Sequence, residues 1–171
     1  MARGVPIVGL EPSCLLSLRD EFLVMGLGDD ARALAKGSFL FEEFLAHEHQ
    51  AGTLQLKLKS LPQKRALLHG HCHQKAFDAV KPVQVVLGLV PDLSVELIES
   101  SCCGMAGSFG YEASHYDVSM KMAELTLLPA IRKAGQDDLI VADGTSCRHQ
   151  IEDGAQRRAE HVARVLERAL A

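Results

Sequence analysis

The residues best suited to chemistry in this chain are cysteines and histidines gathered in three short segments. These candidate metal ligands are Cys72 with its neighbours His71 and His73, the adjacent pair Cys102 and Cys103, and Cys147. Thiolate sulfur and imidazole nitrogen are donors that zinc prefers, and thiolates hold iron–sulfur clusters. The residue types therefore indicate a soft-metal centre, provided that the fold brings the segments together.

The adjacent cysteines Cys102 and Cys103 carry the strongest local signal. On a regular strand their side chains would point to opposite faces, whereas in a loop both sulfurs can turn toward one ion or cluster. Gly104, which follows them, lets the backbone approach closely. Adjacent sulfurs suit neighbouring irons of one cluster, while structural zinc sites favour a C-x-x-C spacing. The alternative is a pair of buried cysteines with a packing role.

The other cysteines stand in segments with capping or basic residues. Ser146 is predicted to cap a helix that carries Cys147 near its N-terminus, where the thiol pKa falls and the thiolate needed by a metal is favoured. Cys14 has a similar setting after Glu-Pro-Ser and is a further candidate ligand. For His71 and His73, ordinary hydrogen-bonded loop positions are the alternative to ligation.

Bulk composition narrows the class of protein. The chain has 171 residues, is 47% hydrophobic and has a formal net charge of -4. No basic block suggests nucleic acid, and no apolar run approaches the roughly 20 residues that span a bilayer. The N-terminus does not resemble a signal peptide, so we expect a cytoplasmic protein with reduced cysteines. Their odd count, five, excludes complete internal disulfide pairing.

The apolar pattern predicts an α/β fold. Strands are expected at residues 5–10, 66–69, 93–98 and 139–142, the first of them buried. Helices are expected after residue 14, across 29–49, 74–90 and 114–134, and at the C-terminus. Within them we expect a break near Gly37 with a cap at Ser38, a boundary at Pro82 and a kink at Pro129. Strands that alternate with helices favour a Rossmann-like three-layer module with a small, mostly parallel sheet. Every cysteine follows a predicted strand, at the edge where ligand sites of such sheets collect.

Two segments of the chain resemble each other. Residues 6–14 (PIVGLEPSC) and 139–147 (LIVADGTSC) both run from an apolar strand through a short turn to Ser-Cys. The rest of the second copy has no counterpart before residue 6. We therefore interpret residues 1–20 as the tail of a preceding repeat, 21–60 as a helical connector and 61–171 as one complete repeat.

The motifs HGHCHQKA (69–76), SCCGMAGSFGYE (101–112) and VADGTSCRHQIEDG (141–154) resemble the cysteine-rich CCG domain. That domain occurs in heterodisulfide reductase and in the iron–sulfur subunits of glycolate oxidase and anaerobic glycerol-3-phosphate dehydrogenase. The motifs are closer still to the C-terminal part of fused FAD-linked oxidases of the D-lactate or D-2-hydroxyglutarate dehydrogenase type. The resemblance covers nearly the whole chain from Val5.

The resemblance implies a tandem of CCG repeats in which Cys14 is the last cysteine of the first. It implies an iron–sulfur cluster, of the 4Fe-4S kind in heterodisulfide reductase, bound by Cys72, Cys102, Cys103 with Gly104, and Cys147. The full motif ends in Cys-x-x-Cys, but here Gly144 occupies the earlier position. An ordinary cluster or a single metal ion is therefore also compatible with the motif.

The resemblance also implies partners for this chain. These are the FAD-binding region and the preceding iron–sulfur repeat of the same parent protein, and an unidentified electron acceptor. It further implies that the parent protein is peripheral at the inner face of the membrane. This chain has no G-x-G-x-x-G between a strand and a helix, so FAD should bind elsewhere and the fragment should not be catalytic alone. The expected role is electron transfer. The rivals are a structural zinc module that joins domains or subunits, and a thiol–disulfide module.

Overall fold

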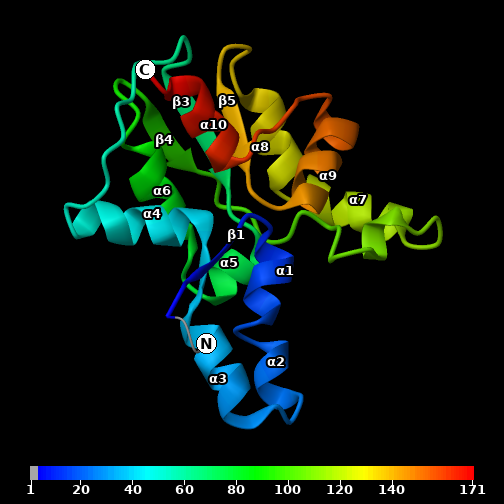
Figure 1. The fold of residues 1–171 in the computed structure, drawn as a ribbon. Helices are drawn as coiled ribbons and strands as arrows, with labels where there is room; N and C mark the ends of the chain where they lie inside the picture. The colour runs from blue at the N-terminus through cyan, green and yellow to red at the C-terminus, as the bar shows by residue number, and fades with distance from the viewer. Residues whose placement is uncertain (1–3) are drawn as a thin grey trace.

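The computed structural model describes residues 4–171, and its centre is a parallel three-stranded sheet (Figure 1). The strand order is β4-β3-β5. The strands are β3 (Arg65–His69), β4 (Ser94–Leu97) and β5 (Leu139–Ala142). Three of the four predicted strands are thereby confirmed, as is the α/β class with parallel pairing.

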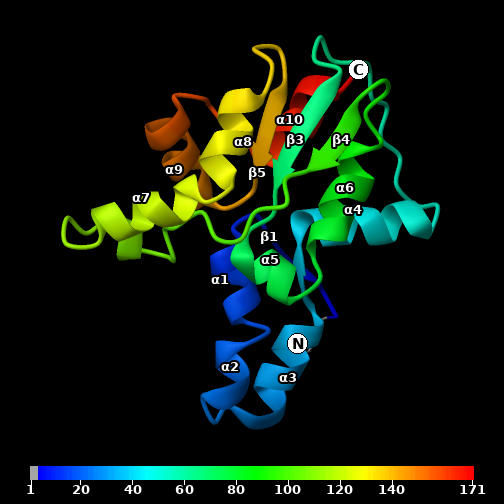
Figure 2. The same ribbon diagram turned by 180° about the vertical axis from the view of Figure 1, so that it is seen from behind.

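Helices cover both faces of this sheet because its buried strands are apolar on both sides. One face packs against α4 (Phe41–Gln50), α6 (Val80–Leu87) and α10 (Val162–Ala169). The other face packs against α8 (Leu127–Lys133) and α9 (Thr145–Ala155). Successive residues of β3 alternate between the two cores: Ala66 and Leu68 join the first, and Leu67 the second. The result is the expected three-layer arrangement, seen from both sides in Figures 1 and 2.

The N-terminal part of the chain forms a second, smaller unit below the carboxyl end of the main sheet (Figure 2). Its two parallel strands are β1 (Ile7–Gly9) and β2 (Ser38–Leu40). Its helices are α1 (Pro12–Ser17), α2 (Glu21–Val24) and α3 (Gly28–Lys36). The strand expected at 5–10 is present but not buried, since Ile7 is 37% and Val8 42% exposed.

The prediction that Ser38 caps a helix is wrong. Ser38 begins β2, and its hydroxyl donates to the Leu34 carbonyl at the end of α3. The helix begins later, at Phe41, where the Glu43 carboxylate accepts from the Leu40 amide at 2.9 Å. The pairing of β2 with β1 joins segments distant in sequence, so no local pattern predicts it.

Two predicted proline effects are also wrong. The helix expected at 114–134 is two helices, α7 (Tyr116–Glu124) and α8, which separate before Pro129. Likewise α5 (Cys72–Ala76) ends before α6 begins, and Pro82 lies inside α6. Both prolines occupy the first turn of their helix, where the missing N–H has no intrahelical partner to lose.

A short 3-10 helix, η1 (Phe109–Tyr111), completes the loop before α7. None of the helices within residues 4–171 has the length and apolarity that a membrane crossing requires.

Candidate metal centre

The carboxyl end of the main sheet brings four cysteines together. Cys72 is the first residue of α5, directly after β3. Cys102 and Cys103 lie in the loop after β4, and Cys147 lies in the first turn of α9, after β5. The sulfurs of Cys103 and Cys147 are 3.2 Å apart. The sulfurs of Cys72 and Cys103 lie close enough to that of Cys102 to lower its pKa, so all four sulfurs are neighbours.

Because the sulfurs lie close together, two of the thiols have lowered pKa values and two have raised pKa values. Hydrogen bonds from Cys103 and Cys72 lower the pKa of Cys102, whose sulfur also accepts the Gly104 amide at 3.2 Å. Hydrogen bonding between Cys103 and Cys147 likewise lowers the pKa of Cys147. The pKa values of Cys72 and Cys103 are raised by their hydrogen bonds within this group, and burial adds to the increase. The sulfurs are thus linked by the protons of S–H···S hydrogen bonds. A metal cation could take the place of those protons.

His69 completes the group, although of the three histidines around Cys72 only His71 and His73 were candidate ligands from the sequence. It is the last residue of β3 and is fully buried. One ligand atom each from His69, Cys103 and Cys147 lies within 4.8 Å of the others. The His69 ring also contributes to the lowered pKa of Cys147, after the larger effect of Cys103. The signal that could have found it is its place at the very end of a predicted strand, beside the position shared by the cysteines.

The two histidines that were candidate ligands make other contacts. His71 caps α5: its Nδ1 accepts from the His73 amide at 3.2 Å, while its Nε2 lies 3.2 Å from Ser13 Oγ. His73 faces Asp20, with 3.7 Å between Nε2 and the carboxylate. Cys14 is exposed on α1 and lies outside the group formed with His69.

Two glycines shape the walls of the site. Gly104 has φ +92°, and a Cβ there would lie 2.1 Å from the Ser119 carbonyl oxygen of α7. Gly144 is the N-cap of α9, so the prediction that Ser146 caps this helix is wrong. A Cβ at Gly144 would lie 2.5 Å from His71 Cδ2 and 3.2 Å from the Cys147 sulfur. His71 thus fills the space that any side chain at position 144 would need.

Basic side chains hold the loops around the sulfurs. Lys75 Nζ donates to the carbonyls of Ser100 and Ser101, which precede the cysteine pair. Arg148 donates to the carbonyls of Ala142 and Asp143 at the end of β5. Both cations therefore fix the strand ends and place positive charge where thiolates gather, which favours an electron-rich centre.

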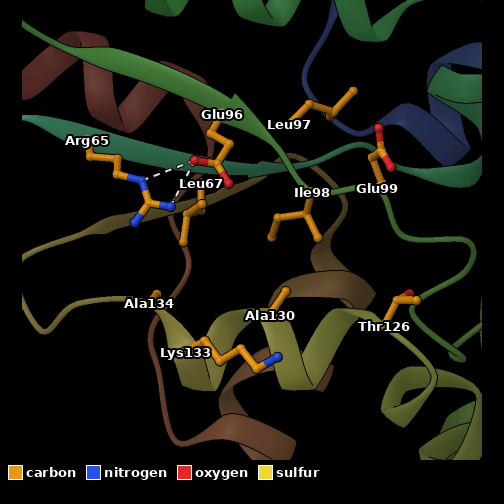
Figure 3. A pocket seen from close by; sticks show the side chains of 10 residues that line it. All are labelled: Arg65, Leu67, Glu96, Leu97, Ile98, Glu99, Thr126, Ala130, Lys133 and Ala134. Carbon is orange, nitrogen blue, oxygen red and sulfur yellow. Dashed lines mark hydrogen bonds and ion pairs between the residues drawn. The ribbon is translucent and has the colours of Figure 1, made fainter.

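A surface pocket lies elsewhere, between β4 and α8 (Figure 3). Arg65 and Glu96 lie on its rim and form an ion pair of 2.8 Å, which neutralises both charges. Thr126, Ala130 and Lys133 line the opposite wall. None of the cysteines lines this pocket, so the candidate centre is a separate feature.

The residues present fit a soft metal or a cluster. Four sulfurs converge, a buried imidazole adjoins them, and glycine lets the backbone pass close by. Within residues 4–171, His69 Nε2 is buried and has no hydrogen-bond partner. An unpaired buried nitrogen costs about 1–3 kcal/mol, and a bound cation would remove that cost.

Comparison with known proteins identifies dehydrogenases as relatives. The chain is 31% identical over 169 residues to a subunit of the anaerobic glycerol-3-phosphate dehydrogenase of Escherichia coli K12; this covers 99% of the chain and 41% of the relative. It is 32% identical over 170 residues to D-2-hydroxyglutarate dehydrogenase of Haemophilus influenzae, covering 93% of the chain and 15% of that protein. The Escherichia coli K12 D-2-hydroxyglutarate dehydrogenase is 28% identical over 165 residues, covering 95% of the chain and 15% of that protein.

The chain therefore spans about two fifths of the first of these relatives and about a seventh of the others. No family model and no solved structure matches it. Its relatives are redox enzymes or subunits of them, and the chain corresponds to a part of each.

Proposed function

We propose that this chain is the iron–sulfur, electron-transfer part of a dehydrogenase that oxidises a 2-hydroxy acid or glycerol 3-phosphate. The observation that carries the proposal is the meeting of Cys72, Cys102, Cys103 and Cys147 at one sheet edge. The similarity to dehydrogenases over almost the whole chain supports a redox role.

The chain's own residues would bind and insulate the centre. Cys103 and Cys147 are buried, whereas Cys102 is partly exposed and Cys72 exposed, so the group has a protected side and a side open to a partner. A bound cluster would supply one-electron transfer, with a potential set by its ligands, hydrogen bonds and exposure. The Gly104 amide donates one such hydrogen bond to a ligand sulfur.

We further propose the division into a tail of a preceding repeat at 1–20, a connector at 21–60 and a complete repeat at 61–171, although β2 of the connector pairs with β1 of the tail. Glu11 accepts from the Thr145 amide at 2.9 Å, and His161 Nε2 lies 2.7 Å from the Leu10 carbonyl oxygen. Residues 10 and 11 thus contact the segments that follow β5. β1 exposes the apolar side chains of Ile7 and Val8, which suits docking against the rest of a repeat and an FAD-binding region of the parent.

Two other functions have a specific observation in their favour. His69, Cys103 and Cys147 would supply three ligands of a tetrahedral zinc site, with a fourth from the neighbouring sulfurs. The contact of 3.2 Å between Cys103 and Cys147 would suit a thiol–disulfide pair. A zinc ion bound by Cys72, Cys102, Cys103 and Cys147 would also use all four sulfurs. The direct adjacency of Cys102 and Cys103 favours the cluster, because adjacent sulfurs suit neighbouring irons better than a single tetrahedral ion.

Metal analysis of the 171-residue chain tests the proposal. We expect chain purified without oxygen to be brown, with several irons and matching sulfide. Cys103→Ser should lose both, because it removes a buried ligand, whereas the exposed Cys14→Ser is the matched control and should keep both.

The other outcomes are equally informative. Colourless chain with a single zinc ion that resists exchange for iron and sulfide would support the structural site. Folded, metal-free chain that cannot be reconstituted would refute a metal centre, and a reversible Cys103–Cys147 couple in it would support the thiol module.

A further inference from the structure

The strongest unassigned feature of the molecule is the His69 side chain, which lies fully buried at the end of β3. Its Nε2 makes no hydrogen bond of regular geometry among the described residues, and the ring's interaction is with the Cys147 thiol, whose pKa it helps to lower after the larger effect of Cys103. The ring places a nitrogen within 4.8 Å of the Cys103 and Cys147 sulfurs, which are themselves in contact. A buried imidazole normally satisfies both nitrogens, so the unpaired one points to a ligand.

The other ring nitrogen is held in place. His69 Nδ1 lies 2.7 Å from Ser100 Oγ, and this hydroxyl donates weakly to the Ile98 carbonyl at 3.5 Å. With its proton directed to Ile98, Ser100 accepts from Nδ1–H, and the lone pair of the neutral ring is left on Nε2. Metal-binding histidines are typically oriented in this way, with the remote N–H donated to a protein acceptor.

The neighbouring positions do not offer an equivalent donor. Gly144 has no side chain, and His71 occupies the space beside its Cα. His71 in turn uses Nδ1 to cap α5 and Nε2 to contact Ser13. His69, by contrast, adjoins two of the sulfurs and keeps one nitrogen unpaired within residues 4–171.

From the juxtaposition of the buried His69 imidazole with the Cys103 and Cys147 sulfurs we propose that His69 is a direct nitrogen ligand of the metal centre. The inference rests on the proposed function, since it requires a metal at this site. A neutral imidazole in place of a thiolate leaves the centre less negative, so its reduction potential is higher than that of an all-thiolate centre.

Pulsed electron paramagnetic resonance of the reduced, iron-loaded chain tests the ligand. With ordinary histidine we expect a strong hyperfine coupling to one 14N nucleus, replaced by a 15N coupling when histidine is 15N-labelled. His69→Cys should keep iron and sulfide, lose the coupling and lower the reduction potential. His73→Cys is the matched control, because it makes the same change on another histidine beside Cys72 whose ring faces Asp20 instead, and it should keep the coupling.

The results separate this inference from the proposed function. A chain that binds no iron and sulfide overturns both. A loaded chain with no nitrogen coupling, with only the weak coupling of a hydrogen-bonded ring, or with the coupling kept in His69→Cys overturns the His69 ligand alone. If His69→Cys does not fold, Ser100→Ala decides: loss of the Nδ1 contact should change the coupling and shift the potential, and an unchanged spectrum refutes ligation.

Discussion

Among single residues, the buried carboxyl of Glu42 is linked through Gln74 to the segment that carries Cys72. Glu42 is fully buried, and its Oε1 accepts from Gln74 Nε2 at 2.6 Å, while the same Nε2 donates to Asp143 at 2.9 Å. Burial, and then the charge of Asp143, raise the pKa of Glu42 to about 8. Gln74 Oε1 also accepts from the His71 amide at 3.0 Å, so this network supports the start of α5 and Cys72.

The titration of Glu42 predicts a pH-dependent stability. The unfolded chain loses this proton near pH 4.5, but the folded chain keeps it to about pH 8, so the free energy of unfolding should fall as pH rises between these values. The slope should approach about 1.4 kcal/mol per pH unit. Urea unfolding from about pH 5 to about pH 8 measures it. Glu42→Gln should flatten the curve, while the exposed control Glu21→Gln should leave it unchanged; equal slopes in both variants would contradict the assignment.

Among the elements, the loop between β4 and α7 depends on close backbone contact. Gly104 and Gly107 both have positive φ, +92° and +68°. Of these two glycines, only Gly104 lies so close to another backbone segment that an added Cβ would clash, with the Ser119 carbonyl of α7. The space around Gly107 is open. The loop that carries Cys102 and Cys103 is therefore pressed against α7 at the residue that follows the pair.

This difference predicts unequal effects of the same substitution. Gly104→Ala should cost about 3 kcal/mol or more, because strain and overpacking add, and should abolish metal binding. Gly107→Ala should cost about 1 kcal/mol, from strain alone, and should keep the metal. Urea unfolding and iron content measure both. Similar losses in the two variants would show that the contact with Ser119 is not the cause.

The N-terminal tail also stabilises a distant helix. Glu11 accepts from both the amide and the hydroxyl of Thr145, at 2.9 and 2.7 Å, and thereby caps the first turn of α9 that carries Cys147. Glu11→Ala should lower the free energy of unfolding by about 1 kcal/mol, as the loss of a helix cap does. Glu21→Ala, an exposed change on the nearby α2, should have little effect, and an equal effect would argue against the cap.

In the molecule as a whole, the centre joins segments that are far apart in sequence. It links the ends of all three strands of the main sheet with α5 and α9. Without a metal, these ends are connected at the site by sulfur contacts such as that between Cys103 and Cys147. A metal bound only in the folded state should therefore stabilise the entire main sheet and the helices packed on it.

Removal of the metal tests this coupling. The metal-free chain should have a lower Tm than the loaded chain, and amide exchange should increase around 70–74, 100–105 and 143–148. The α2–α3 segment projects away from the site in Figures 1 and 2 and should exchange at the same rate in both forms. An unchanged Tm would mean that the metal does not connect the strand ends.

Local sequence patterns were sufficient to predict much of the main sheet and the segments that meet at its edge. Apolar runs located β3 and β5, because a strand buried on both faces must be apolar throughout, whereas the alternation of residues 93–98 located the exposed edge strand β4. The cysteines follow these runs, and parallel strands end at one edge, so their convergence could be anticipated. Which histidine lies beside the sulfurs could not be anticipated, because nothing local separates His69 from His71.

The remaining features depend on tertiary contacts. The register of β3 with β4 and β5 places His69 beside Ser100, Cys103 and Cys147. The two ring nitrogens of His71, by contrast, contact Ser13 of α1 and the first turn of α5. The pairing of β1 with β2, and the exposure of β1, likewise depend on contacts between distant segments. Sequence patterns reflect interactions between residues that are close along the chain. The surroundings of the His69 nitrogen depend instead on atoms from distant segments that the fold places around it.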